Sequence, residues 1–201
     1  LGQLGDASNT SSLAPVDVVG LTGASALAGT WDHTCAVVEG GAVRCWGLNY
    51  YGALGNGSNV DSSTPVEVTG LTGATAVATG VAHTCAVVAA GAVKGWGFNG
   101  DGQLGAGTSV WSGLPVEVIG VSGATAIAAG FGHTCAIVAG GAVKCWGRNN
   151  AGQLGRGSNV PSNVAVDVVG VSGATAIAAN LDHTCVVLTY GTAKCWGANS
   201  N

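Results

Sequence analysis

Histidine and cysteine, two side chains that can bind a metal or attack a substrate, occur together here in a repeated stretch. The first copy, "HTCAVVEGGAVRCWG", begins at His33, and further copies begin at His83, His133 and His183, so the spacing is 50 residues each time. In three copies, two cysteines flank a turn that contains glycine. Such residues could form a metal site, a reactive pair or a disulfide, and the elements that hold them decide among the three.

The repeat occupies the whole chain of 201 residues, which predicts a single propeller or half-propeller domain (1–201) made of repeats 1–50, 51–100, 101–150 and 151–201. A fixed period near 50 residues is typical of propellers and solenoids. The composition of 47% hydrophobic and 8% charged residues with 36 glycines indicates a packed chain with many tight turns, since disordered chains lack apolar residues.

Each repeat contains four short stretches with the composition of β-strands and no helix pattern. Those expected to form the first blade are Ala24–Gly29, His33–Val38, Ala42–Gly47 and Pro65–Val68. The second and third are joined by a short turn with glycine, which indicates a hairpin, and the proline of the fourth suits an outer edge strand. We therefore expect an all-β fold, a β-propeller with four-stranded blades.

The last blade has three strands at the end of the sequence, and "PVDV" (Pro15–Val18) is expected to supply its outer strand and so close the ring. The ring has either four blades from one chain or eight blades from two chains. Opposite charges at fixed positions of the third and fourth strands predict cross-strand pairs that mark this register. The expected pairs are Arg44–Glu67, Lys94–Glu117, Lys144–Asp167 and, across the closure, Lys194–Asp17.

The repeat pattern "GxxHTCAxVxxGxVxCWGxNxxGQLGxG" resembles the repeat of the regulator of chromosome condensation family, in the cysteine-containing form common in bacterial surface proteins. The resemblance covers the whole chain and implies the propeller fold. Its members include a nucleotide exchange factor, light sensors and enzyme inhibitors, so it does not imply one activity. Members usually have seven blades, and their blades meet at a shallow angle suited to large rings, which favours the eight-bladed dimer here.

A hairpin that turns at Glu39–Gly41 places Cys35 opposite Cys45, within the range that a disulfide can bridge. A zinc site is disfavoured because His33 and the two cysteines supply only three ligands without a Cys-x-x-Cys motif; buried free thiols are the other alternative. Cys85 faces Gly95 and is expected to be a buried free thiol. Disulfides predict an extracellular or bacterial cell-surface location. The expected disulfides are Cys35–Cys45, Cys135–Cys145 and Cys185–Cys195.

The four histidines recur at one blade position, and we expect each imidazole to bond the backbone of the neighbouring blade rather than a metal. The tryptophan of each "CWG" is expected to pack between blades, with its N–H satisfied locally. No copy carries an extra acid or a phosphate-binding loop that would distinguish a catalytic site. We therefore expect neither an enzyme nor a cofactor or metal.

The repeats differ most in the loops after the first and third strands, which should emerge on one face of the ring. We expect a non-enzymatic scaffold that binds a protein or glycan through this variable face. A protein inhibitor that covers the active site of an enzyme would be one form of such a scaffold. The alternative is a structural module without a ligand, a duplicated or engineered ring. The expected binding residues are Trp31, Asp32, Tyr50, Tyr51, Phe98, Trp111, Phe131, Arg148, Arg156 and Leu181.

The charge distribution limits the classes of partner that the chain is expected to bind. The formal net charge is -4 and the six basic residues are scattered, so we expect no nucleic-acid binding. The apolar stretch Ala124–Val143 contains His133 and a glycine turn and is expected to form two buried strands, so we expect no membrane insertion. The remaining partners are an unknown protein or glycan and a second copy of the chain.

Overall fold

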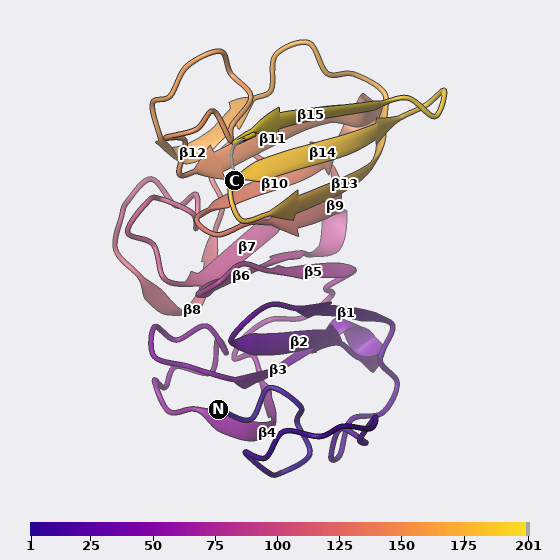
Figure 1. Ribbon diagram of the computed structural model, residues 1–201, viewed down its shortest axis with the longest axis vertical. Helices are drawn as coiled ribbons and strands as arrows, with labels where there is room; N and C mark the ends of the chain where they lie inside the picture. Colours follow the sequence, from indigo (N-terminus) through magenta and orange to yellow (C-terminus); the bar gives the residue numbers. More distant parts are fainter. Residues whose placement is uncertain (200–201) are drawn as a thin grey trace.

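The computed structural model describes residues 1–199 and consists of four antiparallel sheets, or blades, stacked in sequence order (Figure 1). Blade 1 contains β1 (Ala26–Gly29), β2 (His33–Val37), β3 (Val43–Gly47) and β4 (Ser62–Glu67). Blade 2 contains β5 (Ala76–Thr79), β6 (His83–Val87), β7 (Val93–Gly97) and β8 (Ser112–Glu117). Blade 3 contains β9 (Ala124–Ala129), β10 (His133–Val138), β11 (Ala142–Gly147) and β12 (Ser162–Asp167). Blade 4 contains β13 (Ala174–Asn180), β14 (His183–Leu188) and β15 (Ala193–Gly197).

The predicted all-β propeller architecture is confirmed, and strands within a blade pair in the order of the chain. Residues 200 and 201, the last two of the expected fourth repeat, lie outside the described residues. Among residues 1–199 there is no helix long and apolar enough to cross a membrane. The apolar stretch 124–143 forms β9, β10 and the start of β11.

The hairpin between the second and third strands closes through one 3-10 turn in blades 1 to 3: η1 (Glu39–Gly41), η2 (Ala89–Gly91) and η3 (Ala139–Gly141). Gly40 has φ 79°, a left-handed conformation that glycine adopts without steric cost. In blade 2 the equivalent residue is Ala90, at φ 60°. This turn is therefore strained in blade 2 alone of these three.

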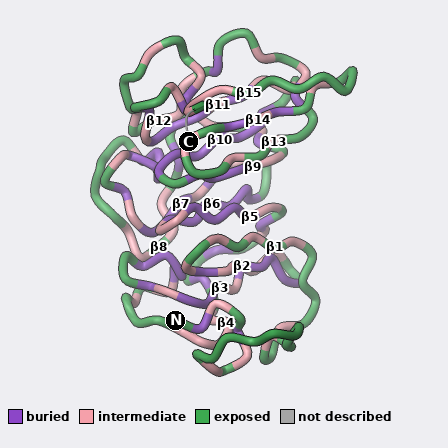
Figure 2. The backbone as a smooth tube through the Cα atoms, in the orientation of Figure 1, coloured by how far each residue is buried: buried purple, intermediate pink, exposed green. Residues whose placement is uncertain are grey.

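The core lies between blades and not within any one of them. One cluster of buried residues combines Cys35 and Val37 of blade 1 with Val77 and Trp96 of blade 2. Figure 2 shows the buried segments on the facing strands, while the loops and the two ends of the stack are exposed. Stability therefore comes from interfaces between consecutive blades, as in other repeat proteins.

The closure expected from Pro15–Val18 is not formed in the structure, where β15 pairs with β14 alone. Residues 15–18 have no strand conformation, and they lie beside blade 1, at the opposite end of the stack from blade 4 (Figure 1). The carbonyl of Gln3 accepts hydrogen bonds from Trp46 and Thr34, so the first residues lie against blade 1, while the free edge of β15 lies at the other end of the stack.

The charged residues of the third and fourth strands lie opposite one another in blades 1 to 3, as predicted. Only Lys144 and Asp167 form a salt bridge within residues 1–199, with 2.7 Å between Nζ and the carboxylate. Lys194 instead donates to the carbonyl of Gly170, and residues 15–18 lie at the other end of the stack. The expected Lys194–Asp17 pair is thus absent from this structure.

Candidate binding face

The antiparallel order of each blade brings two kinds of loop to the same edge. The loop after the first strand and the loop after the third strand both leave the sheet at one end, while the hairpin turns leave at the other. In Figure 1 the long loops before β8 and β4 lie on the left, and the turn between β14 and β15 projects on the right. The variable loops therefore share one face, which we call the loop face.

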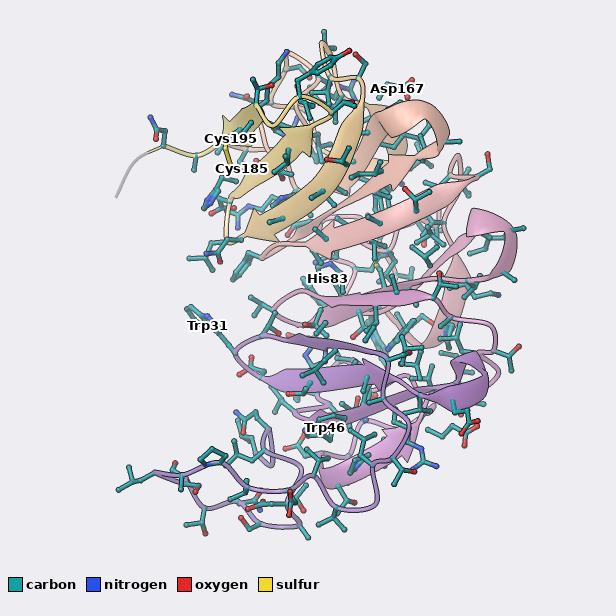
Figure 3. All side chains as sticks on the ribbon, turned by 90° about the vertical axis from the view of Figure 1, so that its right-hand side faces the viewer. Trp31, Trp46, His83, Asp167, Cys185 and Cys195 are labelled. Atoms are coloured by element: carbon teal, nitrogen blue, oxygen red, sulfur yellow. A yellow bond between two sulfur atoms is a disulfide. The ribbon has the colours of Figure 1, made fainter. Side chains whose placement is uncertain are left out.

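A hollow of about 400 Å³ opens on the concave side of the stack, next to this face. Small residues of β1, β5, β9 and β13 form its floor, and one apolar residue from the loop after each of these strands stands at its rim. Trp31 is 70% exposed and projects from the molecule in Figure 3, with Phe131 and Leu181 also exposed. The four rim residues are Trp31, Val81, Phe131 and Leu181.

Two groups of aromatic contacts order the loops of this face. The guanidinium carbon of Arg148 lies 5.5 Å from the centre of the Phe131 ring, a cation–π arrangement. The Tyr51 ring is 4.7 Å from Tyr50 and 4.7 Å from Phe98, which belongs to the next blade. Contacts between loops of different blades hold these rings in defined positions.

The structure thus gathers seven of the ten predicted binding residues into these groups. Trp31, Phe131 and Leu181 line the hollow, Arg148 covers Phe131, and the remaining three form the Tyr51 cluster. Within residues 1–199, no side-chain hydrogen bond or ring contact joins Asp32, Trp111 or Arg156 to either group.

Val81 is not among the ten expected binding residues, although it occupies the same repeat position as the other rim residues. That position, rather than residue type, is the signal that could have found it.

A hydrogen-bond network behind this face joins each blade to the next. Nε2 of His33 lies 2.7 Å from Oγ1 of Thr84, and that hydroxyl donates to the carbonyl of Ala53. The hydroxyl oxygen must therefore accept from His33, which carries its proton on Nε2. The Ala53 carbonyl also accepts from Nε1 of Trp96. The imidazole thus bonds a threonine side chain of the next blade, which corrects the expected backbone partner.

The same bond joins His83 to Thr134 and His133 to Thr184, both at 2.9 Å. All three imidazoles are fully buried, and their Nδ1 atoms have no partner in the described part of the chain. Burial lowers the pKa of His33 and of His133 to about 4. Burial lowers the pKa of His83 to about 3, with a further contribution from the two neighbouring histidines. These side chains are neutral structural groups at pH 7.

The tryptophans of the "CWG" stretches pack between blades as predicted, and each indole N–H donates to a carbonyl 43 residues earlier in the chain, which for blades 2 to 4 lies in the loop after the third strand of the preceding blade. The acceptors of Trp46, Trp96, Trp146 and Trp196 are the carbonyls of Gln3, Ala53, Gln103 and Gln153.

The cysteines form the three disulfides expected from the hairpin register. Cys35 and Cys45 are opposite each other with 4.0 Å between their Cα atoms, and the other two pairs have 4.1 Å. Cys85 is a buried free thiol whose pKa is raised to about 12 by burial, so it is not a nucleophile at neutral pH. No cluster of three or more metal-binding side chains occurs in residues 1–199.

These features define the class of protein: a chain of propeller blades, three with four strands and one with three, joined by a repeated histidine–threonine–tryptophan network. Two family models, both described as the regulator of chromosome condensation (RCC1) repeat, match the sequence. One matches residues 40–87, 90–137 and 141–187, and the other matches 25–53, 74–103, 124–153 and 174–201. The chain belongs to the RCC1 repeat family.

Solved structures agree with this membership. Human WBSCR16 superposes with a TM-score of 0.77 at 26% identity, over 86% of this chain and 47% of that protein. Yeast RCC1 (Prp20), solved bound to Kap60, superposes with a TM-score of 0.74 at 22% identity, over 85% of this chain and 43% of that protein. The ectodomain of the receptor kinase CR4 of Physcomitrella patens superposes with a TM-score of 0.60 at 24% identity, over 94% of this chain and 44% of that protein. This chain thus spans less than half of each. A comparison with curated proteins found no match.

Proposed function

We propose that this chain is a non-enzymatic binding module that recognises a protein through its loop face. The observation that carries the proposal is the exposed rim of Trp31, Phe131 and Leu181 around the concave hollow. An exposed tryptophan beside an apolar hollow offers a contact that would bury much area, and aromatic residues with arginine dominate binding hot spots. The repeats share their buried residues and differ at this rim, as expected of a scaffold with a selective surface.

A protein partner is favoured over a glycan because the rim offers apolar side chains and few polar ones. The guanidinium of Arg148 lies beside the rim, against the Phe131 ring, which suits an acidic or carbonyl group next to the apolar contact. Inhibition of an enzyme by covering its active site is one form that such binding could take. An extracellular or bacterial surface location is part of the proposal, supported by the three disulfides.

The test is affinity capture from extracts and secreted fractions with the wild-type chain, Trp31→Ala and a matched control, Tyr190→Ala. Tyr190 is 96% exposed in the turn between β14 and β15, on the opposite face. A protein retained by the wild type and by Tyr190→Ala, but bound at least about fivefold more weakly by Trp31→Ala, supports the proposal. Equal loss in both variants, or a partner indifferent to Trp31, refutes the assignment of the face. Capture of no protein favours the structural module without a ligand.

A further inference from the structure

At each end of the stack, residues are exposed whose counterparts at the same repeat position are buried between blades. On the face of blade 4 that points away from blade 3, Val187 is 42% exposed, while Val37, Val87 and Ile137 at the same position are 2–3% exposed. His183 and Cys195 are also exposed, unlike the fully buried His33 and Cys45. Around them lies a hollow of about 750 Å³. Blade 4 thus presents the surface with which blades 1 to 3 bind their successors.

Blade 1 presents the opposite surface. Leu27 is 67% exposed, whereas Val77 at the same position of blade 2 is 9% exposed and belongs to the same core cluster as Val37. Ile127 and Ile177 likewise join the clusters that contain Val87 and Ile137. Leu27 is therefore the residue that Val187 would meet if blade 4 were followed by a blade like blade 1.

The hydrogen bonds at the ends are complementary too. His183 is exposed and has no threonine partner among the described residues, whereas the first three histidines each bond one. The hydroxyl of Thr34 donates its proton to the carbonyl of Gln3, so the hydroxyl oxygen can still accept a hydrogen bond. The hydroxyl of Thr84 accepts such a bond from His33 while it donates to Ala53. A His183–Thr34 bond would be the fourth copy of the network.

Residues 12–17 already have local features of an outer strand. The Ser12 hydroxyl donates to the carbonyl of Ala14 at 2.6 Å, the bond that Ser62, Ser112 and Ser162 make at 2.6–2.7 Å in β4, β8 and β12. The amide of Val19 donates to the carbonyl of Gly5, as that of Thr69 does to Gly55. This segment is exposed throughout, with Leu13 fully so.

We propose that a second copy of this chain docks head to tail on blade 4 and that the two copies close a ring of eight blades. Residues 12–17 of each copy pair with β15 of the other, in the register of β11 with β12. Lys194 then faces Asp17, Cys195 faces Val16, and Gly197 faces Ser12. The open edge of β15 is covered by strand addition, and blade 1 of one copy covers the apolar surface of blade 4 of the other.

A second copy fits better than the chain's own first residues. In the structure these residues lie at the opposite end of the stack from β15 (Figure 1). Closure within one chain would have to change the angle at three blade interfaces, each held by a buried histidine–threonine bond of 2.7–2.9 Å. Two copies need no contact between the distant ends of one chain, and they add two interfaces of the same kind as the three within each copy. The concave hollow of each copy then becomes half of a central channel.

The first experiment measures the mass of the native chain by native mass spectrometry and light scattering, with Leu27→Asp and Val110→Asp as matched variants. Both side chains are exposed in the single chain, so neither change removes a core contact, and circular dichroism verifies the fold. We expect the wild type and Val110→Asp to be dimers. We expect Leu27→Asp to be a monomer or to associate at least about 100-fold more weakly. A monomeric wild type, a dimeric Leu27→Asp or larger open assemblies overturn the proposal.

The second experiment tests the register by exchanging charges. Lys194→Glu and Asp17→Lys each place like charges at both interfaces, so each variant alone should associate about tenfold more weakly than the wild type. A mixture of the two variants restores an opposite pair at both interfaces, and the heterodimer should dominate in the mass spectrum. A random mixture of homodimers and heterodimers overturns the strand pairing. Closure within one chain predicts monomers that do not respond to mixing.

Discussion

Lowering the pH from 7.5 to 5.5 should destabilise this chain through its buried imidazoles. His33, His83 and His133 have folded-state pKa values of about 4, 3 and 4, all lowered by burial. In the unfolded chain each has the ordinary value near 6.5. Below pH 6.5 the unfolded chain therefore binds protons that the folded chain does not, and stability falls as the pH falls toward about 4.

The size of the effect follows from linkage. Between pH 7.5 and 5.5 each such histidine lowers the free energy of unfolding by about 1.4 kcal/mol, and three together lower it by about 4 kcal/mol. This is a large part of the stability of an ordinary domain, about 5–15 kcal/mol.

Urea unfolding followed by tryptophan fluorescence and circular dichroism, at fixed protein concentration, measures the loss. His83→Gln is the matched variant, because its amide can still donate to Thr134 but does not titrate. The free energy of unfolding of this variant should fall by about 3 kcal/mol between pH 7.5 and 5.5. A wild type whose stability changes by less than about 1 kcal/mol, or a variant that loses as much as the wild type, would refute the role of the buried imidazoles.

Two further predictions concern the second blade. A cysteine in Gly95→Cys would have its Cβ 3.2 Å from the Cys85 sulfur, so we expect a fourth disulfide, worth about 3 kcal/mol of stability in the loop-closure treatment. The unreduced mass should then be eight hydrogens below that of the thiol form in place of six, two for each disulfide, and an unchanged deficit would contradict it. Ala90→Gly should raise the free energy of unfolding by about 0.5–1 kcal/mol, because it relieves a positive φ of 60° at an exposed turn. Gly40→Ala, the reverse change at φ 79°, is the control and should lower it.

The sequence predicted those features that depend on neighbours along the chain. The alternation around "HTC" and "CWG" and the turn between them determine which residues of a hairpin face each other, so Cys35–Cys45 and the orphan Cys85 follow from counting. The charged pairs of the third and fourth strands followed from the same register, with Lys144–Asp167 forming a salt bridge.

Features that join different blades were predicted less well. The tryptophans were correctly placed between blades, but their acceptors in the preceding "GQLG"-type loops were not identified. The histidines were expected to bond backbone and instead bond threonines 51 residues away. No pattern in the sequence marks the threonine as the partner of a histidine 51 residues earlier. The two side chains meet only because of the way one sheet packs on the next.

The sequence by itself therefore determined the blade: its strands, its register, its disulfides and its membership of a repeat family, because each depends on contacts within about one period. Only the tertiary structure decided how the blades are arranged, which loops meet around the hollow, and that the first residues and the free edge of β15 lie at opposite ends of the stack. The angle between blades is the physical reason. It results from the packing of many side chains 50 residues apart, and a small change in that packing at each interface decides how a stack of identical units closes.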